Sequence, residues 1–225
     1  VTLTLSTART RVRLTEYNFL GLGHRFRNRV DYNYSGVDGS PLSLEGSYLI
    51  PTIQNTYISS GVRYLFSPND DKWGVFMERN FYSALTNWAG GVSYDGRQLK
   101  DSLQFLDEPY EQFSYLGHSS NVWLGRSFRL RAGPTIEEKS TRLVLSGGYT
   151  RTRYDEVRAD TEAVISYFAP VDLYLASLGF SNRKYFTDRY IFDFGELEDV
   201  PTGRVAQVTA GYEKKGSGGR LYTGF

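Results

Sequence analysis

Apolar and polar residues alternate with a period of two along most of this chain, and that alternation restricts the folds it can adopt. Within residues 25–34, Phe26 and Val30 fall on one side of an extended chain, while Arg27 and Arg29 fall on the other. The same alternation is present in residues 42–50, 58–66, 73–81, 88–94, 143–149, 173–180, 205–212 and 221–225. These runs are typical of half-buried β-strands.

Turn-forming residues separate these runs and indicate how many strands and domains to expect. Gly, Pro, Asn and Asp are concentrated in residues 36–41, 51–56 and 67–71. Residues 151–160 form a polar stretch after one of the runs. No linker or shift in composition divides the chain, and helical spacing is convincing nowhere. We therefore predict an all-β fold with about ten or eleven antiparallel strands, in a single domain spanning residues 1–225.

The composition excludes several classes of function. The 26 Lys and Arg residues are balanced by 25 Asp and Glu, and this balance argues against a nucleic-acid-binding surface. The absence of Cys excludes disulfides and thiolate metal sites, and two His are too few for a histidine-rich site. No apolar run approaches the length of a membrane-spanning helix. Val1 opens directly into a strand-like run, so we expect no signal peptide here.

Two all-β interpretations remain, a soluble protein and a transmembrane β-barrel. The mean hydropathy of −0.42 suits a soluble protein, but a barrel also averages as polar because lipid-facing and lumen-facing residues alternate. Aromatic residues favour the barrel, since many of them occupy the ends of expected strands, where outer-membrane barrels have aromatic girdles. They are Tyr48, Tyr64, Phe66, Trp73, Tyr94 and Tyr149. We therefore predict an antiparallel transmembrane β-barrel.

The segment from Asn18 to Phe26 reads Asn-Phe-Leu-Gly-Leu-Gly-His-Arg-Phe. It resembles the turn between the first two barrel strands of the BamA/TamA-like outer-membrane assembly superfamily, with Asn18, Phe19, Gly21 and Gly23 as the motif. The glycines suit a tight turn that requires positive φ. Residues 46–64, 78–81 and 194–203 also resemble segments of this superfamily, and the pieces follow its barrel order.

The resemblance also implies parts that this chain lacks. The family carries POTRA modules before its barrel, and none is visible before Val1. An Arg-Gly-Tyr/Phe loop motif of the family is absent as well. The family barrel has roughly sixteen strands, so we expect this chain to be the N-terminal portion of a longer barrel. The alternative is a complete barrel of about ten strands that ends at Phe225.

The function implied by the resemblance is the insertion or translocation of other proteins, without enzymatic chemistry. The clients would be β-barrel or exported proteins in the lipid of the bacterial outer membrane, and accessory outer-membrane or periplasmic subunits would be possible partners. No cofactor, metal or nucleic acid is implied. A weakly paired seam would open and offer a strand edge to the client. We expect the seam strand within residues 1–14, with Val1, Leu3 and Leu5 facing lipid.

Charged residues on the polar side of the expected strands admit two interpretations. Arg25, Arg27 and Arg29 form a row that would line a lumen favouring anions, or would pair with acidic residues on neighbouring strands. We favour pairing, because an unpaired triple of arginines is costly and acidic residues are equally abundant. The row is expected to face the barrel lumen in either case.

Two competing functions come from other classes. One is a passive or structural outer-membrane barrel, such as a porin. The other is an outer-membrane phospholipase, because His118 and Ser120 would share one face if this segment were a strand, and Asn121 is adjacent. A polar stretch between two apolar segments explains these three residues more simply, so we predict no catalytic site. Glu196, Glu198 and Asp199 match no established calcium loop, and we interpret them as a solvated loop.

Overall fold

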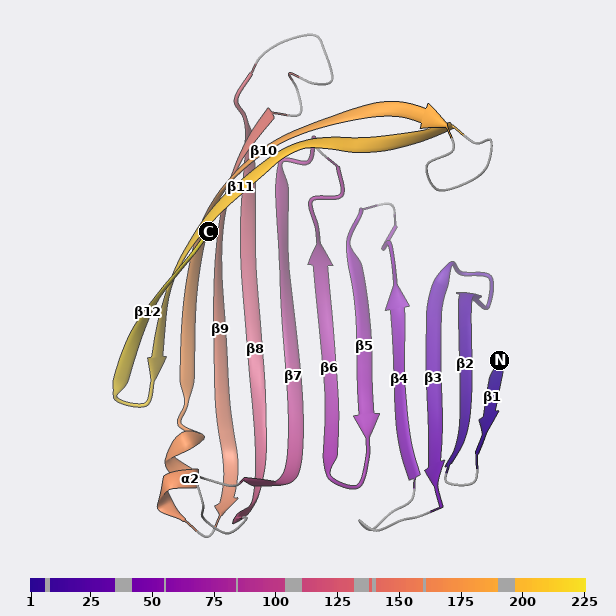
Figure 1. Cartoon of the computed structure of the whole chain (residues 1–225), viewed down its shortest axis with the longest axis vertical. Helices are drawn as coiled ribbons and strands as arrows, with labels where there is room; N and C mark the ends of the chain where they lie inside the picture. The colour runs from indigo at the N-terminus through magenta and orange to yellow at the C-terminus, as the bar shows by residue number, and fades with distance from the viewer. Residues whose placement is uncertain are drawn as a thin grey trace.

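Twelve β-strands form a single antiparallel sheet, in which each strand pairs with the strands next to it in the sequence (Figure 1). The computed structural model describes residues 1–6, 9–34, 42–54, 56–83, 85–103, 111–131, 138, 141–159, 161–189 and 197–225. The strands are β1 (Thr2–Leu5), β2 (Arg9–Phe19), β3 (His24–Asn33), β4 (Leu42–Ile50), β5 (Ser59–Phe66), β6 (Asp70–Arg79), β7 (Trp88–Leu103), β8 (Glu111–Arg129), β9 (Thr141–Ala159), β10 (Val171–Arg189), β11 (Leu197–Lys215) and β12 (Gly218–Gly224).

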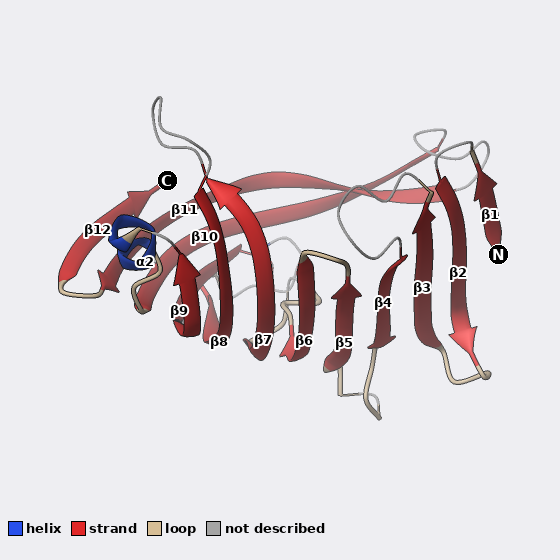
Figure 2. Cartoon of the chain, turned by 90° about the horizontal axis from the view of Figure 1, so that it is seen from below, coloured by secondary structure: helices blue, strands red, loops and turns tan. Residues whose placement is uncertain are grey.

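The sheet is curved and open. Figure 2 shows β2 to β9 as an arc, with β10 and β11 running back across toward the side where β1 to β3 lie. In the described part of the chain, β1 pairs only with β2, and β12 pairs only with β11. The prediction of an all-β antiparallel fold is confirmed, but these strands do not close into a barrel.

The described sheet has twelve strands rather than the ten or eleven predicted. The first 19 residues form two strands, β1 and β2. A whole strand, β8, was missed because the polar segment from His118 to Asn121 interrupts the alternation of apolar residues. The polar stretch at residues 151–160 was also misjudged, since β9 continues through it as far as Ala159.

The pairing register separates the side chains into two faces of different character. Val75 pairs with Val62 and Tyr94, and Met77 pairs with Val92, so apolar side chains form continuous rows across the strands. The opposite face of the same strands carries polar and charged side chains, such as Arg63 and Asp95. We call these the apolar face and the polar face. Along its middle, the apolar face presents Val62, Val75, Met77, Val92, Val122, Leu124, Leu145, Leu178 and Val208.

No second layer covers the apolar face in the described part of the chain. Val92 is 53% exposed and Leu124 is 59% exposed, although both are paired with strands on either side. Charged residues on this face include Arg126, which stacks over Trp88 at 4.1 Å, and Arg153 of β9, which pairs with Asp172 at 2.8 Å. Soluble monomers rarely expose apolar surface on this scale.

Aromatic rings on the apolar face lie over glycines of the neighbouring strands. A Cβ atom at Gly96 would stand 2.5 Å from the indole of Trp73, and one at Gly46 would meet the ring of Tyr64. Rings laid over glycine in this way fill the gap left by the missing side chain and fix the pairing register. The rings of Trp73 and Tyr94 are 5.4 Å apart, which extends this aromatic row across β6 and β7.

A short helix, α2 (Glu162–Tyr167), lies between β9 and β10, whereas we predicted no helix. Six residues are too few to give a recognisable helical period in the sequence. Val164 and the following Phe168 are buried against Phe113, at the end of the sheet where β7, β8 and β9 meet. None of the helices in the described residues is long and apolar enough to cross a membrane.

Candidate functional site

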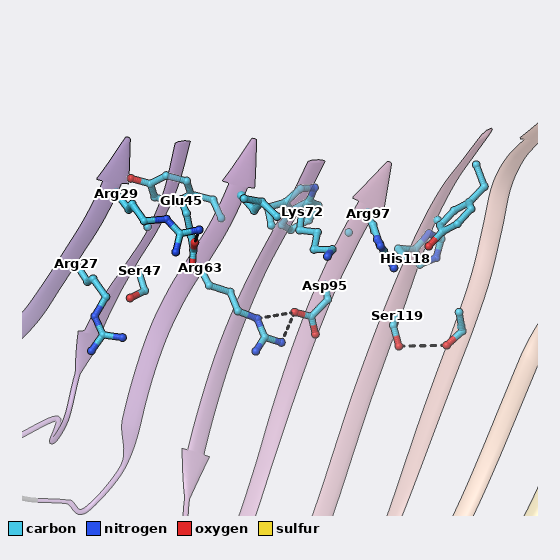
Figure 3. A pocket seen from close by; sticks show the side chains of 18 of the residues that line it. Arg27, Arg29, Glu45, Ser47, Arg63, Lys72, Asp95, Arg97, His118 and Ser119 are labelled. Carbon is cyan, nitrogen blue, oxygen red and sulfur yellow. Dashed lines mark hydrogen bonds and ion pairs between the residues drawn. The ribbon is translucent and has the colours of Figure 1, made fainter. Parts of the chain in front are cut away.

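A hollow of about 1050 Å³ opens on the polar face, over β2 to β9. Figure 3 shows the charged side chains that project into it from neighbouring strands. Arg27 and Arg29 come from β3, Arg63 from β5, and Asp95 and Arg97 from β7. The hollow therefore combines many guanidinium groups with few carboxylates.

Asp31 of β3 holds together the end of the polar face nearest to β1. Its carboxylate forms ion pairs with Arg9 at 2.7 Å, with Arg11 at 2.6 Å and with Arg29 at 2.9 Å. Asp31 is only 4% exposed, and Arg29 also pairs with Glu45 of β4. One buried carboxylate thus serves three guanidinium groups that come from two strands.

Six arginines share the polar face of β2 and β3, and we call this group the arginine column. Its members are Arg9, Arg11 and Arg13 of β2 and Arg25, Arg27 and Arg29 of β3. Arg13 lies directly opposite Arg29 in the pairing register, and like charges in such positions destabilise a sheet. Among the described residues, Arg13, Arg25 and Arg27 form no ion pair. The column therefore carries more positive charge than Asp31 and Glu45 neutralise.

The polar face of β5 to β7 is balanced by contrast. Arg63 donates to Asp95 through Nη2 at 2.6 Å, across the glycine at position 74 of β6. Asp70 accepts from Arg97 Nε at 2.7 Å and pairs with Lys72 at 2.5 Å. Each of these cations has a carboxylate partner, in contrast to Arg13, Arg25 and Arg27 of the column.

The strand β1 lies beside the arginine column and has one free edge in the described structure. Leu3 pairs with Val12, which places Val1, Leu3 and Leu5 on the apolar side, where they are 91%, 60% and 67% exposed. Thr2 pairs with Arg13 and Thr4 with Arg11, so the polar side of β1 carries only short side chains. A strand added at this edge would lie near the column.

The turn that carries the family-like motif joins β2 to β3 at residues 20–23. Gly21 and Gly23 have φ values of 75° and 70°, and the Asn18 side chain accepts a hydrogen bond from the Gly23 amide at 2.7 Å. The rings of Phe19 and Phe26 stack with their centroids 4.7 Å apart. The turn follows the second strand of the sheet, because residues 2–5 form a strand of their own.

The alternative catalytic residues are only partly brought together. His118 and Ser120 lie on the apolar face of β8, and His118 Nδ1 lies 3.1 Å from Asp155 Oδ2. Asn121 lies on the polar face, where it donates to Thr150. No hydrogen bond joins His118 to Ser120 in the described structure, so the nucleophile is not activated there.

The calcium-binding alternative falls mostly outside the described residues. Glu196 is not described. The loop prediction is wrong for Glu198 and Asp199, because both lie in β11, where they pair with β10; their side chains are not described. Within the described ranges, no group of three or more histidine, aspartate or glutamate side chains is arranged to hold a metal ion.

The sequence pattern alone did not single out half of the arginine column. Arg25, Arg27 and Arg29 stood out as a row, whereas Arg9, Arg11 and Arg13 follow the same period of two but were not singled out. The partner role of Asp31 depends on the antiparallel register between β2 and β3, which places it opposite Arg11. Counting charges along each strand of the expected first hairpin could have found this cluster.

Comparison of this chain with protein family models, curated proteins and solved structures produced no match.

Proposed function

We propose that this chain forms part of the wall of an outer-membrane β-barrel of BamA/TamA type, which inserts or translocates other β-barrel or exported proteins. The observation that carries the proposal is an uncovered apolar face on a sheet whose opposite face is charged and hollow. In a closed barrel of roughly sixteen strands, the apolar face would contact lipid and the polar face would line an aqueous lumen.

Strand lengths support the membrane assignment. The strands β2 to β6 have 8 to 11 residues, which is close to the 9 to 11 that a tilted strand needs to cross a bilayer. The longer β7 to β11 would extend beyond the hydrocarbon region. The position of Trp88 supports the membrane assignment too, because it is the first residue of β7 and would mark one interface.

The seam is proposed at the free edge of β1. This strand has four residues and pairs with β2 alone in the described structure, so few backbone hydrogen bonds hold it. An unpaired strand edge in lipid is costly, because no water satisfies its amide and carbonyl groups. A client strand that adds to β1 would satisfy them by β-augmentation.

Cross-linking at β1 tests this function. These 225 residues contain no Cys, so Thr2→Cys or Thr4→Cys introduces the one thiol of this part of the protein, which is tested in lipid vesicles. The probe is an unfolded outer-membrane β-barrel protein with one Cys in its last strand. We expect oxidation to trap a disulfide-linked adduct at position 2 or 4.

The matched control for that experiment is Ser47→Cys, which lies on the polar face of β4 between two paired neighbours. It should give no adduct, because its strand has no free edge. Equal yields from position 47 and from β1, or no adduct from β1, would contradict the proposed seam. Ion conductance without client adducts would favour the passive barrel, a possibility supported by the charged hollow.

A further inference from the structure

We propose that the arginine column selects client strands that carry carboxylates on their lumen-facing side. This inference rests on the proposed function, because it concerns the strand that adds to β1. It names the chemistry of the substrate segment, namely alternating apolar residues toward lipid and Asp or Glu toward the lumen.

The register places Arg11 and Arg13, the column residues opposite β1, within reach of such a strand. A client strand paired with β1 would lie two strands from β2, at about 10 Å, given the strand spacing of a sheet. Its lumen-facing residues would fall in the rows that contain Thr2 with Arg13 and Thr4 with Arg11. The threonines are short, so the long arginine side chains can extend across them toward client carboxylates.

The positive charge of the column should favour client strands with negatively charged side chains. Asp31 already pairs with three arginines, and Glu45 pairs with Arg29, which is one of the same three. Arg13 and Arg27 have no ion-pair partner among the described residues and line the hollow. Guanidinium groups bind carboxylates through paired hydrogen bonds, so an acidic client strand would relieve the repulsion between Arg13 and Arg29.

A purely structural role for the column does not account for its composition. Arginines that serve only to join strands would each have a carboxylate partner, as Arg63 has in Asp95 and Arg97 has in Asp70. In the described structure, the column arginines without an ion pair, Arg13, Arg25 and Arg27, lie on β2 and β3, beside the strand with the free edge. Neutralising Arg13 or Arg27 removes no described ion pair, so these substitutions should leave the fold intact.

The test compares two versions of one client strand, with Glu or with Gln at its lumen-facing positions. Cross-linking is measured at Leu3→Cys, on the apolar side, so that Thr2 and Thr4 remain in place. We expect half-maximal adduct formation at about fivefold lower concentration for the Glu version. The ratio of the half-maximal concentrations of the Gln and Glu versions should fall toward one in Arg13→Gln/Arg27→Gln, which lacks two of the positive charges. It should also fall at high salt, because salt screens these charges.

The matched control is Arg220→Gln, which neutralises an arginine of β12 away from β1 and should keep the preference. Equal cross-linking of the Glu and Gln versions would overturn this inference without contradicting the proposed seam at β1. Absence of adducts with both versions would overturn the proposed function as well. A preference that survives Arg13→Gln/Arg27→Gln unchanged would exclude the column as its source.

Discussion

Val92→Arg is expected to abolish stable insertion of this protein into lipid vesicles, whereas Ser93→Arg should leave insertion nearly unchanged. Val92 lies in the middle of the apolar face, and an arginine near the bilayer midplane costs about 2–4 kcal/mol in a transmembrane barrel. Ser93 lies on the polar face, opposite Asn121 of β8, and an added guanidinium there would be hydrated by the aqueous lumen. Urea titration of folding in vesicles, followed by gel mobility, measures both changes.

The two positions are adjacent in β7, so the comparison separates the two faces from any effect on the strand itself. Equal effects of the two substitutions would contradict the membrane assignment. A large loss with Ser93→Arg and none with Val92→Arg would indicate that the polar face, rather than the apolar one, is enclosed by protein.

Asp31→Asn is expected to destabilise the folded protein by about 2–3 kcal/mol. The substitution removes the buried carboxylate that pairs with Arg9, Arg11 and Arg29; Arg29 keeps Glu45, whereas Arg9 and Arg11 lose their ion-pair partner. The loss in the free energy of unfolding should be smaller when Asp31→Asn is combined with Arg11→Gln, because this second substitution removes one of the arginine charges that lost its partner. The same urea titration gives the change in the free energy of unfolding.

Asp95→Asn is the matched control for that prediction. Its partner Arg63 has a side chain that is 62% exposed, so water can replace the lost ion pair. We expect a change of less than about 1 kcal/mol. A loss at position 95 as large as the one at position 31 would show that Asp31 has no special role in joining β2 and β3.

The strands were predictable wherever one flank is apolar and the other polar. Residues 25–34 and 42–50 show this contrast, and they correspond closely to β3 and β4. The strand β8 was missed because polar residues from His118 to Asn121 fall on both of its faces. The helix α2 depends on burial of Val164 against Phe113, a contact between distant segments that local periodicity does not contain.

The candidate site was predictable only in outline. The row of Arg25, Arg27 and Arg29 is evident in one strand, because alternation assigns the three to one face. The pairing of Arg29 with Glu45, and of Asp31 with Arg11, requires the register between neighbouring strands. Pairing was the favoured interpretation, and Arg29 is paired, while Arg25 and Arg27 have no ion pair with any described residue.

The most direct measurement for this account is a cysteine scan of four consecutive positions on β8, residues 121–124, in vesicles. The chain has no Cys of its own, so each substitution carries one environment-sensitive fluorophore. We expect lipid-soluble quenchers to reach labels at Val122 and Leu124, and aqueous iodide to reach those at Asn121 and Trp123. Aqueous quenching at all four positions, or lipid quenching at Asn121 and Trp123, would contradict the assignment of the apolar face to lipid.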